Sequence, residues 1–125
     1  MEEIQYDDFA KLDIRIGTVM AVEKVPDTDK LLKCTIDFGD PSTDSTGSPQ
    51  AGSGQGIGTR TIVSGIAAWK QPEDLVGKQL PYVVNLAPRM LRGVESQGML
   101  LAVSDEHGVA LFTPERVVPN GTKVR

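Results

Sequence analysis

Alternation of apolar and polar side chains is the feature that most limits how this chain can fold. From Ile14 onward the even positions are Ile14, Ile16, Thr18, Met20 and Val22, while the odd positions include Arg15 and Glu23. A period of two predicts a long strand with one buried face, and Gly17 stands where a strongly curved strand could bend. Residues 32–38 alternate in the same way, which predicts a second strand. These patterns favour an all-β fold.

Later segments also have the composition of strands. They are Thr59–Ser64, Leu80–Leu86, Gly98–Val103 and Val109–Phe112, with a turn at Pro119–Gly121 before a short strand at Thr122–Val124. The first of these is rich in β-branched residues. The second and third are more continuously apolar, as strands buried on both faces would be.

Helical signals are few in this sequence. Residues 71–77 place a proline and two acids in a first turn and a glycine at the end, which predicts a short helix. A second short turn over residues 6–11 precedes the first strand. Five core strands, a short helix between strands 3 and 4 and C-terminal extension strands predict an OB-fold Greek-key barrel. On pattern alone, an SH3-like barrel is the main alternative.

A chain of 125 residues is long enough for one buried core and too short for two, so we expect a single domain over residues 1–125. Residues 40–58 differ from the rest because they contain almost no apolar side chains. We expect a flexible loop insertion there, since lengthening a surface loop costs little entropy. Its glycines do not form the Gly-x-Gly-x-x-Gly pattern of a dinucleotide site.

The net charge of −4 argues against a nucleic-acid partner, but the charges are unevenly distributed. Residues 1–29 contain eight acids and three bases, whereas residues 60–101 contain five bases and three acids. An acidic end can keep a protein soluble while a locally positive face meets phosphate. The charge pattern therefore permits RNA binding without requiring it.

Location and metal binding are limited by what the sequence contains. No stretch approaches the roughly 20 apolar residues of a membrane span, and the acidic start is unlike a signal peptide. The single cysteine, Cys34, allows no internal disulfide, and one cysteine with one histidine cannot form the usual structural zinc site. We expect a cytoplasmic protein with no membrane contact and no cofactor.

Four blocks of residues form a recognisable signature. They are residues 8–19 (DFAKLDIRIGTV), 26–33 (PDTDKLLK), 60–67 (RTIVSGIA) and 84–102 (VNLAPRMLRGVESQGMLLA). Together they closely resemble the tRNA-binding domain family, which includes the C-terminal appendix of many methionyl-tRNA synthetases, free-standing tRNA-binding proteins and the endothelial monocyte-activating polypeptide domain. The likeness covers nearly the whole chain except residues 40–58.

The sequence also departs from this family. The loop at residues 40–58 is longer than usual, and Met90 stands where a lysine is common. No synthetase catalytic domain is present, so the resemblance does not imply aminoacylation. Both ends of the chain are also similar to export-related chaperones of the same superfamily, which lack the R-G-x-E-S-Q-G-M run found at residues 92–99.

The resemblance and the residue chemistry together suggest an RNA-binding face. Its candidate residues are Lys30, Lys33, Ser64, Asn85, Arg89, Arg92, Ser96, Gln97 and Met99. The lysines and arginines suit phosphate, and the polar groups and the thioether suit ribose and unstacked bases. The alternatives are a strand-end cap for Asn85, a turn hydroxyl for Ser96, core packing for Met99 and plain solvation for the cations.

Catalytic chemistry has little to use in this sequence. His107 lies in a segment that predicts a hairpin turn, and Cys34 falls on the apolar side of its strand. The resemblance implies a non-catalytic protein that binds the outer corner of tRNA as a homodimer. It also implies a candidate partner, a separate aminoacyl-tRNA synthetase specific for methionine (methionyl-tRNA synthetase), which the protein would assist in trans. The alternative function is that of an export-related peptide-binding chaperone.

Overall fold

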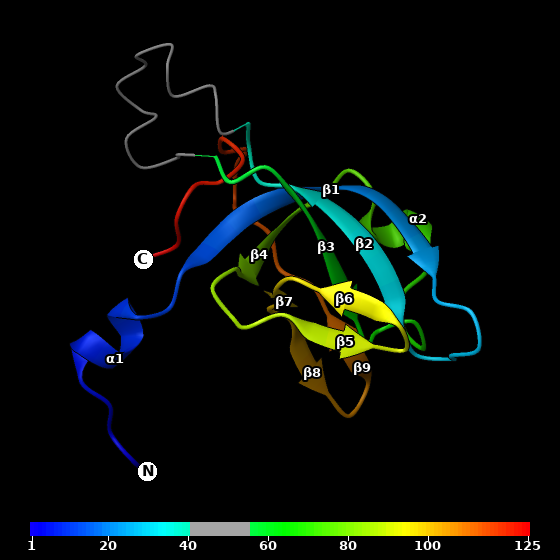
Figure 1. The fold of residues 1–125 in the computed structure, drawn as a ribbon. Coiled ribbons are helices and arrows are strands. Elements are labelled where there is room, and N and C mark those ends of the chain that lie inside the picture. Colours follow the sequence, from blue (N-terminus) through cyan, green and yellow to red (C-terminus); the bar gives the residue numbers. More distant parts are fainter. Residues whose placement is uncertain (41–55) are drawn as a thin grey trace.

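The computed structural model describes residues 1–40 and 56–125 and contains one curled five-stranded antiparallel sheet (Figure 1). Its strands are β1 (Ile14–Lys24), β2 (Leu32–Asp37), β3 (Thr59–Ser64), β4 (Gln79–Val83) and β7 (Met99–Leu100), in the spatial order β3-β2-β1-β4-β7. The all-β, OB-fold prediction is confirmed. None of the helices in the described residues is long and apolar enough to cross a membrane.

Strand β1 pairs with two neighbours, because its first half is hydrogen-bonded to β4 and its second half to β2. The predicted alternation holds for Ile14 and Ile16, which are buried. It is wrong at the middle of the strand, because Val19 is buried while Met20 is 55% exposed. A register irregularity between Val19 and Ala21 then reverses the faces again, and Val22 packs against the core as its even position predicted.

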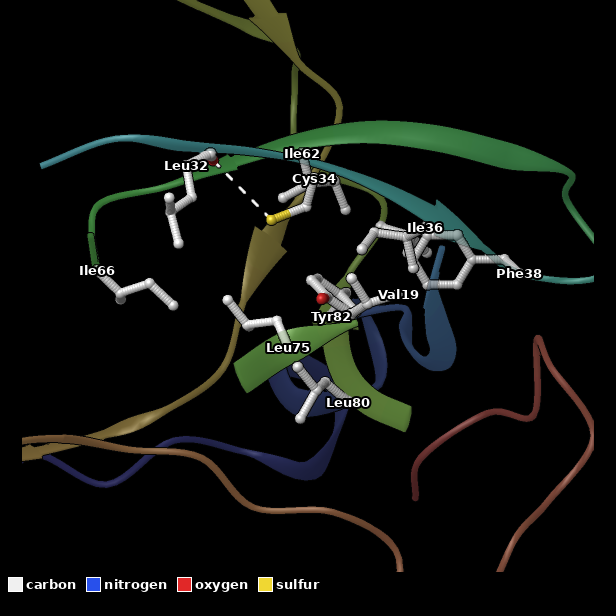
Figure 2. Close-up of a cluster of buried hydrophobic side chains, with 11 residues drawn as sticks. Val19, Leu32, Cys34, Ile36, Phe38, Ile62, Ile66, Leu75, Leu80 and Tyr82 are labelled. Atoms are coloured by element: carbon white, nitrogen blue, oxygen red, sulfur yellow. Dashed lines mark hydrogen bonds between the residues drawn. The ribbon is translucent and has the colours of Figure 1, made fainter. Parts of the chain in front are cut away.

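The core lies inside this curled sheet and contains residues from every long strand (Figure 2). Leu32, Ile36 and Phe38 are fully buried on β2 and just beyond it, as their alternation predicted. The rings of Phe38 and Tyr82 meet edge to face, with centroids 5.6 Å apart. Because strands from both halves of the sheet contribute, the core fixes the curvature of the whole barrel.

The predicted helix between the third and fourth strands is present as α2 (Pro72–Leu75). The carboxylate of Asp74 accepts the backbone N–H of Gln71 at 2.8 Å and so caps the first turn. Leu75 is buried in the core, and Gly77 leaves the helix with a φ of 87°. The first helix, α1 (Tyr6–Ala10), has no buried residue and stands away from the barrel (Figure 1).

Two hairpins extend the barrel beyond the main sheet. One consists of β5 (Arg89–Leu91) and β6 (Val94–Ser96), and the other of β8 (Val103–Asp105) and β9 (Gly108–Ala110). The prediction of one buried strand over Gly98–Val103 is wrong in its extent. Strand β7 has only two residues, and Val103 is 53% exposed because it already belongs to the next hairpin.

The C-terminal segment lies along the free edge of the first half of β1. The backbone N–H of Ile16 donates to Thr122 O at 2.9 Å, and Val124 N–H donates to Ile14 O at 2.7 Å. The strand predicted at Thr122–Val124 is therefore reduced to a single bridge, between Arg15 and Lys123.

Most of the loop predicted over residues 40–58 falls on residues 41–55, which lie outside the described residues. Its two flanks are paired to each other. Gly58 N–H donates to Gly39 O at 2.7 Å, and Phe38 N–H donates to Gly58 O at 3.0 Å. Gly58 thus continues the pairing of β2 with β3. The loop therefore ends before residue 58, earlier than predicted.

Gly17 permits the close approach of β1 to the core side chains of β2. A Cβ atom at this position would lie 2.5 Å from Ile36 Cγ2 and 2.7 Å from Phe38 Cε1. We expect Gly17→Ala to lower the free energy of unfolding by about 1–3 kcal/mol through overpacking. Urea unfolding measures this loss, and Gly65→Ala is the matched control because a Cβ there meets nothing within 4 Å. Equal stability of the two variants would contradict the prediction.

Candidate nucleic-acid interface

The segment that contains Arg89 and Arg92 is a β-hairpin rather than the predicted loop. Its two-residue turn has positive φ at both positions, 51° at Arg92 and 82° at Gly93, as in the type I′ turns that suit twisted strands. Both arginines are exposed, and neither guanidinium has an ion pair or hydrogen bond to any described residue. The hairpin therefore presents two exposed guanidiniums, one from the start of β5 and one from the turn that follows it.

Met90 lies between these arginines but faces the other way. Arg89 pairs across the hairpin with Ser96, whereas Met90 pairs with Glu95. Since successive side chains in a strand point to opposite faces, Met90 and Arg89 do not share a surface. A lysine at position 90, as is common in the resembled family, would therefore add its charge to the face opposite Arg89.

Lys30 and Lys33 have different surroundings. Lys30 is exposed and lines a surface depression together with Arg92, so the structure brings these two predicted residues to one place. Asp27 and Asp29 line the same depression and offset its positive charge. Lys33 lies on β2, where its Nζ is 3.4 Å from a carboxylate oxygen of Glu23.

Ser96 and Gln97 bind the edge of β3 rather than standing free. The hydroxyl of Ser96 accepts the backbone N–H of Val63 at 2.9 Å and donates to Gly98 O at 3.2 Å. The Oε1 of Gln97 accepts the backbone N–H of Thr61 at 2.9 Å. Ser64, at the end of β3, is also buried. Ser96 and Gln97 therefore join β3 to the end of the β5–β6 hairpin, and Ser64 is buried on β3, so the three do not form an open polar face.

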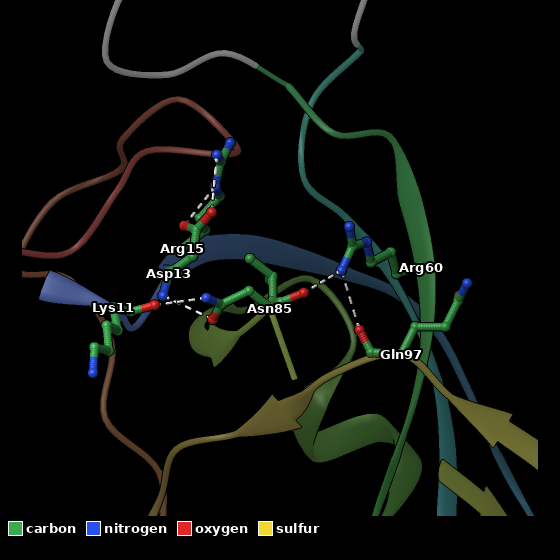
Figure 3. Close-up of polar contacts among 7 residues, drawn as sticks. Lys11, Asp13, Arg15, Arg60, Asn85 and Gln97 are labelled. Atoms are coloured by element: carbon green, nitrogen blue, oxygen red, sulfur yellow. Dashed lines mark hydrogen bonds and ion pairs between the residues drawn. The ribbon is translucent and has the colours of Figure 1, made fainter. Parts of the chain in front are cut away.

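Asn85 caps the end of β4, which was the alternative to a role in base contact. Its Oδ1 accepts the backbone N–H of Asp13 at 2.9 Å, and its Nδ2 donates to Lys11 O at 2.7 Å (Figure 3). The side chain thus joins the end of β4 to the connection between α1 and β1.

Met99 is 47% exposed, so the alternative of core packing is wrong for this residue. It pairs with Val83 at the edge between β7 and β4. Leu86, in the connection that follows β4, is also exposed. Each of these exposed apolar side chains suits contact with ribose carbons or a base face.

Arg60 on β3 was absent from the predicted site. Its Nη1 donates to the carbonyl oxygens of Val84 and Gln97, which lie before and after the β5–β6 hairpin (Figure 3). The only signal in the sequence is a long cation inside a short β-branched strand. That signal does not reveal the contacts, which are between residues 24 and 37 positions apart.

The described residues contain no arrangement suited to catalysis. Burial raises the pKa of the Cys34 thiol to about 11, so this thiol stays protonated at neutral pH and is a poor nucleophile. His107 occupies the turn between β8 and β9, as predicted, and is exposed. Within residues 1–40 and 56–125, no group of three His, Cys, Asp or Glu side chains could hold a metal ion.

Comparison with known proteins identifies the class of this domain. The family model described as "Putative tRNA binding domain" matches residues 50–123. The chain is 46% identical to the methionine–tRNA ligase of Parabacteroides distasonis over 99% of its own length, but it spans only 16% of that relative. The chain belongs to the tRNA-binding domain family.

Two solved structures are similar over the full length of both chains or nearly so. The MetRS-related protein of Pyrococcus horikoshii is 39% identical, with a TM-score of 0.82 and complete coverage of both chains. The chaperone CsaA of Bacillus anthracis is 31% identical, with a TM-score of 0.77 and coverage of 99% of this chain and 100% of that one. The same fold thus occurs in relatives with two different descriptions.

Ser96→Ala tests whether the hydroxyl of Ser96 stabilises the fold or is free to bind RNA. The change leaves the buried N–H of Val63 without its acceptor, and we expect a loss of about 1–3 kcal/mol in the free energy of unfolding. Chemical denaturation measures this loss, with the exposed Ser104→Ala on β8 as control. If Ser96→Ala is as stable as Ser104→Ala, the hydroxyl does not hold β3 in place.

Proposed function

We propose that this chain is a non-catalytic module that binds folded tRNA at its outer corner, where the D and T arms meet. The observation that supports this proposal best is the β5–β6 hairpin, which presents the exposed Arg89 and Arg92 without an ion pair to any described residue. Membership of the tRNA-binding domain family supports the same ligand. We do not assign aminoacylation to the chain, which covers 16% of the synthetase it matches.

The chemistry of the hairpin suits phosphate more than base edges. Guanidinium groups bind phosphate oxygens through paired N–H donors, and such contacts fix position without reading sequence. The two-stranded ribbon also brings the backbone positions of both cations onto one short segment. Recognition of a folded RNA by the shape of its backbone follows from this arrangement.

We further propose that the protein acts as a homodimer and assists a methionyl-tRNA synthetase in trans. The acidic net charge of −4 limits what a single face gains from phosphate, and two linked faces raise avidity through effective concentration. The similarity to methionine–tRNA ligase supports the choice of synthetase.

A peptide-binding chaperone is the second candidate function. The similarity to CsaA favours it, and so does an apolar groove lined by Ile16, Pro81, Phe112 and Val124. Such a groove would take apolar peptide side chains, and its affinity would depend little on salt. RNA binding depends strongly on salt because bound cations release counterions from phosphate.

The first prediction of this proposal is a preference for folded RNA. In a mobility shift with bulk tRNA and an unstructured RNA of equal length, we expect tighter binding of tRNA that weakens as salt rises from 50 to 200 mM. Equal binding of both RNAs, or binding of neither, would remove the tRNA proposal and leave the chaperone to be tested with an unfolded peptide.

The second prediction concerns the hairpin. We expect Arg89→Ala with Arg92→Ala to weaken tRNA binding about tenfold or more and to make its salt slope shallower by about one to two. Both side chains are exposed, so the thermal midpoint should not change. Arg116→Ala with Lys123→Ala removes the same charge from the exposed C-terminal segment and is the control. Unaltered affinity in the hairpin variant would move the site elsewhere.

A further inference from the structure

Only one terminal nitrogen of the Arg60 guanidinium, Nη1, is hydrogen-bonded to a described residue, and the edge formed by Nε and Nη2 is not. Its Nη1 donates to Val84 O and to Gln97 O, the latter at 3.3 Å (Figure 3). An amino nitrogen has two protons, so these two carbonyls use all that Nη1 can donate. Nε and Nη2 have no hydrogen-bond or ion-pair partner among the described residues. One pair of parallel N–H donors therefore remains available.

Arg60 belongs to the lining of a groove on the surface. Arg60 and Gln97 line one side of it, and residues 84–88 line the other. Residues 84–88 lead directly into Arg89, so the groove adjoins the base of the hairpin. The residues that line it include no carboxylate, in contrast to the depression beside Lys30 and Arg92, which contains two aspartates.

Anchoring changes what this arginine can do for a ligand. A free surface arginine loses rotamer entropy when it is fixed. Arg60 is already fixed by the two carbonyls, so less of that loss remains at the moment of binding. Its open Nε and Nη2 donors match two oxygens of one phosphate group, a bidentate geometry that lysine cannot form.

We propose that Arg60 is a further phosphate-binding residue, which holds a backbone phosphate of the bound tRNA in the groove between β3 and residues 84–88. This inference rests on the proposed function, because the phosphate belongs to tRNA. The same side chain ties together the two ends of the hairpin segment. It therefore binds phosphate from a position fixed relative to Arg89.

Arg60→Met tests the proposal, with tRNA binding measured at several salt concentrations. We expect the affinity near 0.1 M salt to fall about tenfold and the slope of log K against log salt to become shallower by about one. Arg60→Lys keeps the charge but not the paired donors, so the slope should match the wild type while affinity falls several-fold. Arg116→Met is the control. It also removes one positive charge, but Arg116 lies beside Gln79, at the end of β4 opposite to residues 84–88.

The outcomes separate this proposal from the proposed function. If the wild type does not bind tRNA, both fail. If it binds and loses affinity with the hairpin variant, but Arg60→Met keeps wild-type affinity and slope, only the role of Arg60 fails. A loss of affinity with an unchanged slope would mean that Arg60 only shapes the connection. If thermal unfolding shows that Arg60→Met is not folded, wild-type affinity in Arg60→Lys overturns the proposal.

Discussion

The contact of β3 with Ser96 and Gln97, at the end of the β5–β6 hairpin, determines where the hairpin lies. Strand β3 is an edge of the five-stranded sheet, and an unpaired edge is a site of aggregation. Here the edge is satisfied by Ser96 and Gln97, through two side-chain acceptors and one backbone bond from Gln97 N–H to Thr61 O at 2.8 Å. The guanidinium of Arg60 adds hydrogen bonds to Val84 O, in the segment that leads into the hairpin, and to Gln97 O. The same interactions that close the barrel thus position the arginines.

Much of the fold could be predicted from the sequence, because its periodicity reflects a real separation of faces. Strand β2 follows its alternation without exception, and α2 lies where its proline, acids and glycine indicated. The irregularity after Val19 and the two-residue length of β7 could not be predicted. Both depend on partners far away in the sequence, and an apolar run does not reveal where a strand leaves its sheet.

The candidate site was less predictable than the fold, for a chemical reason. A serine hydroxyl or an amide side chain has the same donors and acceptors whether it meets a ribose or completes a β-ladder. Ser96, Gln97 and Asn85 therefore suggested ligand contacts from sequence, while the structure uses them to satisfy backbone groups of β3, of Asp13 and of Lys11. The exposed hairpin arginines were the opposite case. Their long charged side chains have no backbone partner, so the fold left them at the surface.

The acidic net charge and an RNA ligand are compatible because several of the acids are distant from the hairpin or paired with a basic side chain. Asp7 and Asp8 lie on α1, which stands away from the barrel (Figure 1). Asp13, beside Asn85, is paired with Arg15 at 2.9 Å. The positive charge of Arg15 offsets the negative charge of Asp13, and physiological salt screens exposed charges that lie more than about 10 Å apart. These acids therefore oppose a phosphate at the hairpin only weakly. No acidic residue lines the groove beside Arg60, so no carboxylate in that lining offsets the positive charge of Arg60. Local arrangement, more than total charge, therefore decides whether this fold can bind an anion.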